Sequence, residues 1–436
     1  MLETTIEIAL TIFVVLMLAA QLLALRFKIP YTLILVFIGI GVTTLSTVAL
    51  TANPVTNILQ TSIQWIRSLY TQLVSSGLFV GLVVPPLIFE AMMHIRRREL
   101  RAVIRPSLAL ATVGVLLSTI IVGIAVWKLE GLSLFSSLLF AAIVAPTDTI
   151  TVLQIFKHVK VPAKLSTLMD LEAGLNDATA IVIFTAILSL SAAGLANASI
   201  IQGSEFFLYD FFGGILVGII VASIARLVHA KVNDKLAETT LTMAAVYGSY
   251  VLATGIGASG LIAVVIVGLY FGNTTLKSAL SKRVRFAVVS FWEIAAFIGN
   301  AVAFLLIGFE TNLALFADAG ILILVAYTST LIARAVVVYP TLAIFNQAEK
   351  NRKHRMPLSW SNVAMFGGVR GALSIALVAA LASSGAVSSA DLSKITTLVL
   401  GVVFISIIAQ VPILSRYASG LFGRHKKPQE LHWSHH

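Results

Sequence analysis

Residues 138–156 read LLFAAIVAPTDTITVLQIF, a long apolar run with Pro146, Thr147, Asp148 and Thr149 at its middle. About 20 apolar residues are needed to cross the hydrocarbon core of a bilayer as a helix. Pro146 removes a backbone donor and crowds the preceding turn, while the two threonines compete for the carbonyls that are freed. The stretch therefore predicts a membrane helix that is interrupted at a polar point.

A second apolar stretch is interrupted in a similar way. Residues 364–377 read AMFGGVRGALSIAL, with Gly367, Gly368 and Gly371 around Arg370. Glycines weaken the interior of a helix and allow another backbone to come close. Proline and glycine are also simply common in membrane helices, but a charge at each interruption favours a functional interpretation.

The composition places the whole chain in a bilayer. Of the 436 residues, 58% are hydrophobic and 11% are charged, and the mean hydropathy is +0.98. Soluble domains carry about 25% charged residues, so we expect an all-α polytopic membrane protein. The absence of cysteine excludes disulfides and thiolate metal sites. The thirteen predicted spans are 5–25, 29–48, 75–94, 106–127, 132–156, 165–194, 206–228, 237–256, 258–274, 286–309, 316–345, 360–383 and 392–415.

The two interruptions occupy matching positions in these thirteen spans. If the seventh span is a linker, spans one to six and eight to thirteen form two six-helix units, and the broken spans are fifth in each. An odd separation of seven spans gives the units opposite orientations. The sequence thus predicts two inverted six-helix repeats with two discontinuous crossing helices, an arrangement that points to an ion site at the midplane.

The basic residues predict the orientation. With the first terminus outside, 25 of the 30 lysines and arginines fall in the odd-numbered connections and the C-terminal segment. The positive-inside rule therefore favours an N-terminus outside and a C-terminus in the cytoplasm, with the protein in the cell membrane. The net charge of +11 is then a topology signal, and we expect no nucleic-acid partner.

The sixth span carries acids at membrane depth. It includes LMDLEAGLNDATAIVIF (168–184), in which Glu172 and Asn176 share a helix face and Asp177 is rotated by about 140° from Glu172. Asp177 and Asp148 lie at similar predicted depths. With Asn176, Thr147 and the carbonyls freed at the break, they form a hard, all-oxygen ligand set that suits a small alkali cation.

Two arginines are available inside the spans to neutralise these acids. They are Arg334 in the eleventh span and Arg370 in the twelfth. Their depths permit either one as the partner of Glu172. Charges inside a membrane are costly and are functional by default, although mutual pairing for helix packing is the alternative.

Secondary candidates lie nearer the ends of spans. Glu90 lies near the inner end of the third span. A functional role and simple extension of its carboxylate to the membrane interface are equally favoured there. Glu293 and Asn300 share a helix face and are expected to form a structural network. We expect His94 and His229 to be solvated at cytoplasmic ends, and Trp292 to be an interface anchor.

Several short motifs, taken in order, resemble one family. LEAGLNDATAIV (171–182) is similar to the Glu-x-x-x-Asn-Asp signature of the electroneutral branch of cation–proton antiporters, which contains NhaP-type prokaryotic proteins and animal sodium/hydrogen exchangers. Further similar motifs are PPLIFEA (85–91), APTD (145–148), FWEIAAFIGNAVAFLLIG (291–308), LIARAV (331–336) and GGVRGALS (367–374).

The resemblance implies roles for individual residues. Asp177 would carry the ion or proton, with Asp148 and Thr147 also lining the Na⁺ site. Glu172 would be salt-bridged to Arg334, and Asn176 would organise the polar groups. Arg370 would offset helix-end and acid charges. The sequence departs at Ala173, where the family commonly has serine, and at Thr149, where proline often follows the aspartate.

The resemblance also implies a homodimer built from two kinds of domain. Residues 1–105 and 206–310 would form the dimerisation scaffold, residues 106–205 and 311–417 the ion-translocating core, and residues 418–436 a short basic cytoplasmic tail. The function expected is electroneutral exchange of a monovalent cation, Na⁺ before Li⁺ or K⁺, for H⁺ in pH homeostasis, by alternating access and with no cofactor. The alternatives are a gated cation channel, a K⁺/H⁺ antiporter and a symporter for organic anions; no enzyme motif is present.

Overall fold

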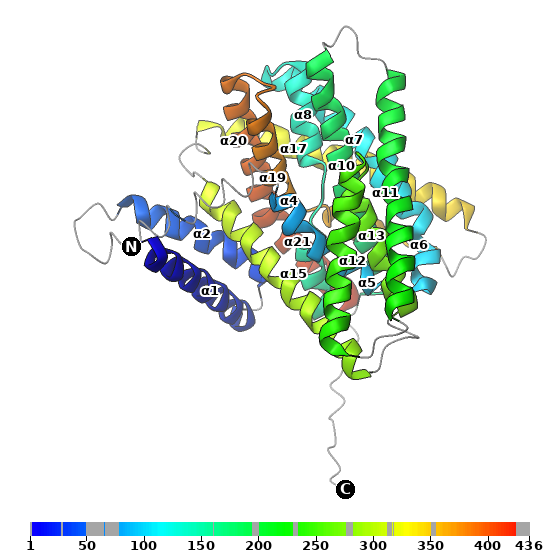
Figure 1. The fold of residues 1–436 in the computed structure, drawn as a ribbon. Coiled ribbons are helices and arrows are strands. Elements are labelled where there is room, and N and C mark those ends of the chain that lie inside the picture. The colour runs from blue at the N-terminus through cyan, green and yellow to red at the C-terminus, as the bar shows by residue number, and fades with distance from the viewer. Residues whose placement is uncertain are drawn as a thin grey trace.

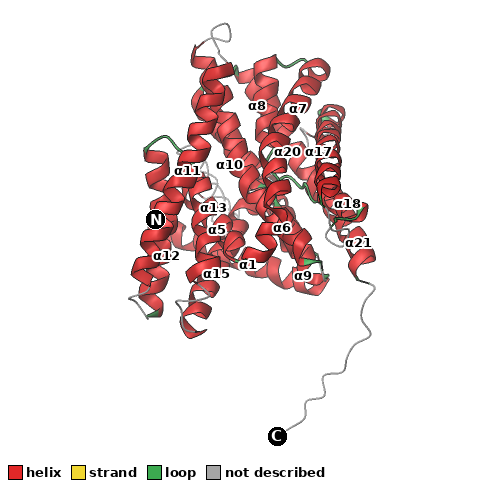
Figure 2. Cartoon of the chain, turned by 90° about the vertical axis from the view of Figure 1, so that its right-hand side faces the viewer, coloured by secondary structure: helices red, strands yellow, loops and turns green. Residues whose placement is uncertain are grey.

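The computed structural model describes residues 2–27, 29–48, 65, 78–159, 161–193, 200–229, 234–275, 282–311, 316, 318–349 and 355–423. These residues form a bundle of helices and contain no strand (Figure 1, Figure 2). Seven helices are long and apolar enough to cross a membrane, and shorter apolar helices accompany them. The chain is therefore a multi-pass helical membrane protein, as predicted.

Every predicted span overlaps one helix or two consecutive helices. In the first half these are α1 (Leu2–Phe27), α2 (Tyr31–Val48), α4 (Leu78–Leu82), α5 (Val84–Met93), α6 (Arg97–Ala109), α7 (Val115–Glu130), α8 (Leu134–Val144), α9 (Thr149–His158) and α10 (Ala163–Ala193). In the second half they are α11 (Ile200–His229), α12 (Lys235–Gly255), α13 (Gly260–Tyr270), α15 (Lys282–Glu310), α17 (Gly320–Ala348), α18 (Leu358–Phe366), α19 (Ala372–Ser384), α20 (Ser389–Ile405) and α21 (Val411–Phe422).

Both predicted interruptions are confirmed. α8 ends at Val144 and α9 begins at Thr149, so the residues from Ala145 to Asp148 are not helical. α18 ends at Phe366 and α19 begins at Ala372. Each break falls at the proline or the glycines that the sequence places there, because these residues weaken the continuous helical hydrogen-bond pattern.

The helices pack in two groups, one of which contains the breaks. α10 lies against α6 and α8, while α17 lies against α7 and α20. On the other side, α13 packs against α5, α11 and α12, and α15 packs against α2 and α5. α1 lies at the periphery against α2 (Figure 1), with apolar side chains such as Leu18 and Leu22 exposed as expected for a surface that faces lipid.

Three π-helical turns among the described residues were not predicted. They are η1 (Leu110–Gly114) between α6 and α7, η3 (Phe271–Thr275) after α13 and η5 (Ser406–Gln410) between α20 and α21. π turns are frequent at functional sites. η5 contacts both sides of the second break, because the Ser406 hydroxyl accepts from the Arg370 N–H at 3.1 Å and Gln410 Nε2 donates to the Phe366 carbonyl at 2.7 Å.

The last helix corrects the predicted start of the tail at residue 418. α21 continues to Phe422, and Ala418 is fully buried. The reason is that Tyr417 accepts a hydrogen bond from Asn362 at 3.0 Å and lies against Phe366, so this turn packs on α18. Residues 424–436 lie outside the described residues.

Trp292 is buried rather than an interface anchor. It is 1% exposed, and the centroid of its ring lies 4.6 Å from that of the Phe89 ring. Its indole N–H donates to the Thr242 hydroxyl at 3.0 Å. The position of a residue along a span gives its approximate depth but not the direction of its side chain. That is why the sequence misplaced it.

His229 is also buried rather than solvated. It is 1% exposed and forms a hydrogen bond with Glu238, near the start of α12. Glu238 is itself 0% exposed. The same helix is capped by Asp234, whose carboxylate accepts from the N–H groups of Ala237 and Leu236 at 2.9 Å. The N–H of Ala237, joined by that of Leu236, holds the pKa of Asp234 below its usual value.

The closest approach between α2 and α15 depends on two glycines. A β-carbon added to Gly39 would lie 2.6 Å from the carbonyl oxygen of Leu305 and 2.8 Å from the α-carbon of Gly308. A β-carbon on Gly308 would lie 2.4 Å from the carbonyl oxygen of Val36. Both backbones therefore occupy the space that side chains would need, as in other close contacts between membrane helices.

We predict that Gly39→Val lowers the thermal stability of the purified protein, because α2 and α15 must separate. Overpacking of this kind costs about 1–3 kcal/mol. Gly41→Val is the matched control on the same helix, since nothing lies within 4 Å of its added β-carbon. Equal melting temperatures for the two variants in detergent would contradict the predicted contact.

Candidate functional site

The two breaks meet each other. The N–H of Asp148, at the first break, donates to the carbonyl of Val369, at the second, over 2.6 Å. A β-carbon on Gly371 would lie 2.6 Å from the β-carbon of Asp148. A glycine is therefore required at position 371 for this close approach.

Arg370 lies between the two breaks. Its Nη1 donates to the carbonyl of Ala145 at 2.6 Å and to that of Pro146 at 3.3 Å. These carbonyls follow the C-terminal end of α8, where a helix carries partial negative charge and favours a cation. Carbonyls freed at the break were expected to bind the ion, whereas these two are engaged by Arg370.

Asp148 immediately precedes α9, at the helix end where partial positive charge favours a carboxylate. Its Oδ2 accepts a hydrogen bond from the Thr151 hydroxyl at 2.5 Å. The Thr151 hydroxyl in turn lies 3.2 Å from the hydroxyl of Thr32 on α2. Asp148 is therefore connected by two hydroxyl groups to a helix outside the crossing.

Asn176 positions Thr147. Its amide Nδ2 donates to the Thr147 hydroxyl at 2.7 Å, and both residues are buried. Its Oδ1 has no hydrogen-bond partner among the described residues. The contact joins α10 to the first break, and it orients the Thr147 oxygen.

Glu172 forms a two-pronged ion pair with Arg334 of α17. One guanidinium nitrogen, Nη1, contacts Oε1, while Nη2 lies 2.9 Å from Oε2 and 3.0 Å from the carbonyl of Ala364. Both side chains are buried. The predicted depths permitted Arg334 or Arg370, and the structure pairs Glu172 with Arg334.

A small cavity of about 70 Å³ lies at the crossing. Of the predicted ion ligands, Asp177, Asp148 and Thr147 line it and Asn176 does not, and Ala173 is beside them. Its other walls are mainly apolar. Glu172 does not line this cavity, because its carboxylate faces Arg334.

A larger cavity of about 890 Å³ adjoins the small one. The two share Leu87, Ala91, Asp170 and Asn300 in their walls. The larger cavity extends toward the end of the bundle where α5 and α9 end and α10 begins. The carboxylates of Asp148 and Asp177 therefore lie in a small cavity that adjoins a larger cavity toward one end of the bundle.

The secondary candidates line this larger cavity. Glu90, Glu293 and Asn300 all contribute to its wall. Asp170 lies in the walls of both cavities, although the sequence predicted no role for it. A spacing of seven residues places Asp170 on the same helix face as Asp177, and this was the sequence signal for it. Thr149 was the other position at which the sequence departs from the family, and its side chain lies outside the described part of the structure.

Two broken helices that cross beside buried carboxylates are typical of secondary ion transporters. The chain matches the family described as "Sodium/hydrogen exchanger, transmembrane" over residues 10–419, and it belongs to that family.

Relatives and solved structures agree with this assignment. The chain is 32% identical to the Na(+)/H(+) antiporter ApNhaP of Aphanothece halophytica, over 88% of this chain and 68% of that protein. It is 32% identical to the Na(+)/H(+) antiporter NhaH of Halobacillus dabanensis, over 76% of this chain and 80% of that protein. The fold matches the sodium proton antiporter MjNhaP1 of Methanocaldococcus jannaschii with a TM-score of 0.73 and 20% identity, over 98% of this chain and all of that one.

We predict that Glu172→Gln or Arg334→Gln alone destabilises the protein by about 3–5 kcal/mol, because each strands a buried charge. The double variant should lose less than the sum, since no unpaired charge remains. The measurement is a double-mutant cycle of thermal stability in detergent.

The control cycle combines Glu172→Gln with Glu238→Gln, which shares no partner with it, and should be additive. Strict additivity for Glu172 and Arg334 would argue against a stabilising pair. Arg370 would then be tested in place of Arg334.

Proposed function

We propose that this protein exchanges Na⁺ for H⁺ across the cell membrane, with Asp177 as the group that carries either ion. The observation that supports this most directly is the small cavity at the crossing, which is lined by Asp177, Asp148 and Thr147 and adjoins a larger cavity. Carboxylate and hydroxyl oxygens suit a hard cation. The relatives quoted above are named as Na⁺/H⁺ antiporters, which supports Na⁺ before Li⁺ or K⁺.

The exchange would follow from competition for one carboxylate. A bare charge in a small, mainly apolar cavity is costly, so Asp177 is better occupied by a proton or by a cation than by neither. Occupancy by one excludes the other. Thr147 would supply a neutral oxygen ligand, held in place by Asn176, and Asp148 a second carboxylate.

The transport cycle would require alternating access. In this proposal residues 106–205 and 311–417 move as the core, against a scaffold of residues 1–105 and 206–310 that also forms a homodimer. The N-terminus lies outside and the larger cavity opens to the cytoplasm. The distribution of lysine and arginine supports this orientation, and the contacts between the two breaks support movement of the crossing as one unit.

We expect Asp177→Asn to abolish sodium-dependent proton flux in proteoliposomes, because it deletes the titratable ligand and keeps the shape of the side chain. Asp210→Asn is the control, since it removes a buried carboxylate on α11, away from the crossing. The control should retain exchange. Substantial flux by a folded Asp177→Asn protein would contradict the assignment of Asp177 as the group that carries the ions.

We further expect exchange to be electroneutral, one cation for one proton. Asn176 stands beside Asp177 and cannot exchange a proton for a cation, while Glu172 is paired with Arg334. If Asp148 keeps its charge in both loaded states, Asp177 alone titrates during the cycle. Moving one uncompensated charge across 100 mV would be worth about 2.3 kcal/mol, which a rate measurement would detect.

The test compares initial rates of sodium-driven proton flux with and without a potassium potential clamped by valinomycin. Equal rates are expected. A several-fold change with the imposed potential, or a current on a solid-supported membrane at saturating sodium, would mean that a second group titrates. Asp148→Asn would then be examined for restored voltage independence.

A further inference from the structure

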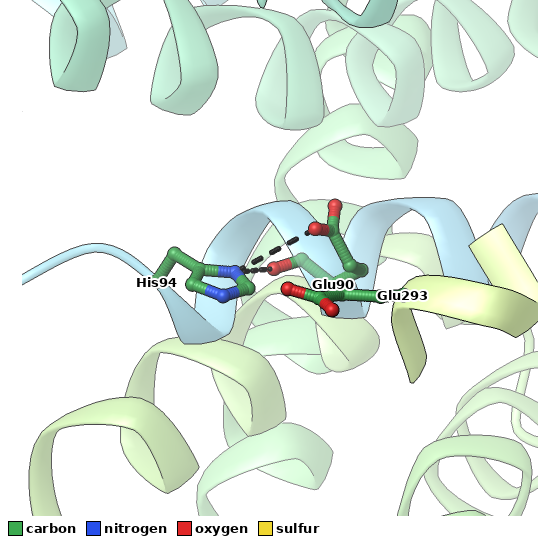
Figure 3. A group of neighbouring side chains, drawn as sticks. All are labelled: Glu90, His94 and Glu293. Carbon is green, nitrogen blue, oxygen red and sulfur yellow. Dashed lines mark hydrogen bonds and ion pairs between the residues drawn. The ribbon is translucent and has the colours of Figure 1, made fainter. Parts of the chain in front are cut away.

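A second group of ligating side chains lies away from the crossing, at the wall of the larger cavity. Glu90 and His94 come from the end of α5, and Glu293 comes from α15 (Figure 3). One ligand atom from each of the three lies within 4.8 Å of the others. All three residues line the larger cavity, so the group is in contact with water and with any ion that enters.

The imidazole has a defined orientation. His94 Nδ1 lies 2.8 Å from the backbone carbonyl of Glu90 and 3.7 Å from its Oε1 (Figure 3). A carbonyl only accepts, so Nδ1 donates in this contact, and Nε2 is the ring nitrogen that would bind a metal. Metal-binding histidines are commonly held in this way, with the second ring nitrogen donating to a carbonyl.

The donor set favours one class of ion. One imidazole and two carboxylates form a mixed nitrogen and oxygen set, which suits Zn²⁺ and similar divalent ions better than Mg²⁺ or Ca²⁺. Bonds to Zn²⁺ are about 2.0–2.2 Å long, so two ligands of one ion lie at most about 4.4 Å apart. Small rotations of these partly exposed side chains would close the remaining gap.

A buried amide farther along α15 lies between this group and the crossing. Asn300 is 5% exposed, and its side chain lies beside the Tyr31 hydroxyl of α2. Its position, seven residues after Glu293, puts both on one helix face. Asn300 lines both cavities, so the Glu90–His94–Glu293 group stands beside the route to Asp177.

We propose that Glu90, His94 and Glu293 bind one divalent cation of the zinc class at the wall of the larger cavity, and that the bound ion inhibits exchange. The metal would cancel the two negative charges of Glu90 and Glu293, so this part of the route would no longer attract an incoming alkali cation. The binding step is independent of the transported ions. The inhibitory step rests on the function proposed above.

The binding test uses the full chain with His432, His435 and His436 replaced by alanine, because these terminal histidines would also bind zinc. Zinc binding to this parent is measured by competition with a chromophoric chelator. His94→Ala and Glu293→Gln are made in the same background, and His158→Ala removes an imidazole at the end of α9 as the control.

We expect one zinc ion to bind to the parent and to the His158→Ala variant, with affinity at least about tenfold weaker in the other two variants. Magnesium at the same concentration should not compete. Glu293→Gln keeps the shape of the side chain, so it gives a result even if His94→Ala fails to fold. Equal zinc affinity in the parent and both site variants would overturn the proposed site.

The inhibition test compares the exchange rate with and without zinc for each protein in proteoliposomes. We expect zinc to slow the parent at least fivefold at the concentration that fills the site, and to have little effect on His94→Ala. Equal inhibition of both, or binding without inhibition, would overturn the regulatory role. Absence of exchange in the parent without zinc would instead contradict the proposed function and leave the binding result intact.

Discussion

The structure depends on how two broken helices satisfy their backbone groups inside a bilayer. Hydrocarbon offers no hydrogen-bond partners, so an interrupted helix is tolerated only where protein or a cavity replaces the lost bonds. Each break here is satisfied in part by the other, and the second break also by Ser406 and Gln410 of η5. The Asp148 N–H bonds to Val369, and the Arg370 side chain bonds to Ala145 and Pro146. The small cavity lies where the chain could not remain helical, so the breaks and the proposed ion site would have the same cause.

The charges are arranged so that one buried pair is neutral, while the described residues that line the small cavity include three carboxylates and no basic side chain. Glu172 and Arg334 share two contacts and stay away from the cavity. Arg370 neutralises the end of α8. Asp177 is left in a wall that otherwise holds Asp148, Asp170 and neutral groups. This separation would let α10 carry a permanent ion pair on one face and a changeable charge on the other, as the proposed exchange requires.

The sequence predicted features that depend on position along the chain, and it predicted that Glu172 and Asp177 face different neighbours, but it did not identify those neighbours. Pro146 and the glycines near Arg370 located both breaks, because their effects on a helix are local. The predicted depths allowed either Arg334 or Arg370 to pair with Glu172. The packing of α10 against its neighbours, which the sequence does not show, determines that the partner is Arg334. Trp292 and His229 were misplaced because their distance from a span end said nothing about the neighbours they face. Asp170 was overlooked, although its seven-residue spacing from Asp177 places both on one face of α10.

The π turn at Ser406–Gln410 has a consequence for the register of the C-terminal part of the chain. Such a turn contains one residue more than an α-helical turn, and each residue rotates a helix by about 100°. The faces of α20 and α21 are therefore offset by that extra residue. Loss of a single residue between 406 and 410 would restore a regular helix and rotate Tyr417 away from Asn362 and Phe366. The number of residues in the segment 406–410, and not only its composition, thus determines how α21 packs against α18 at the second break.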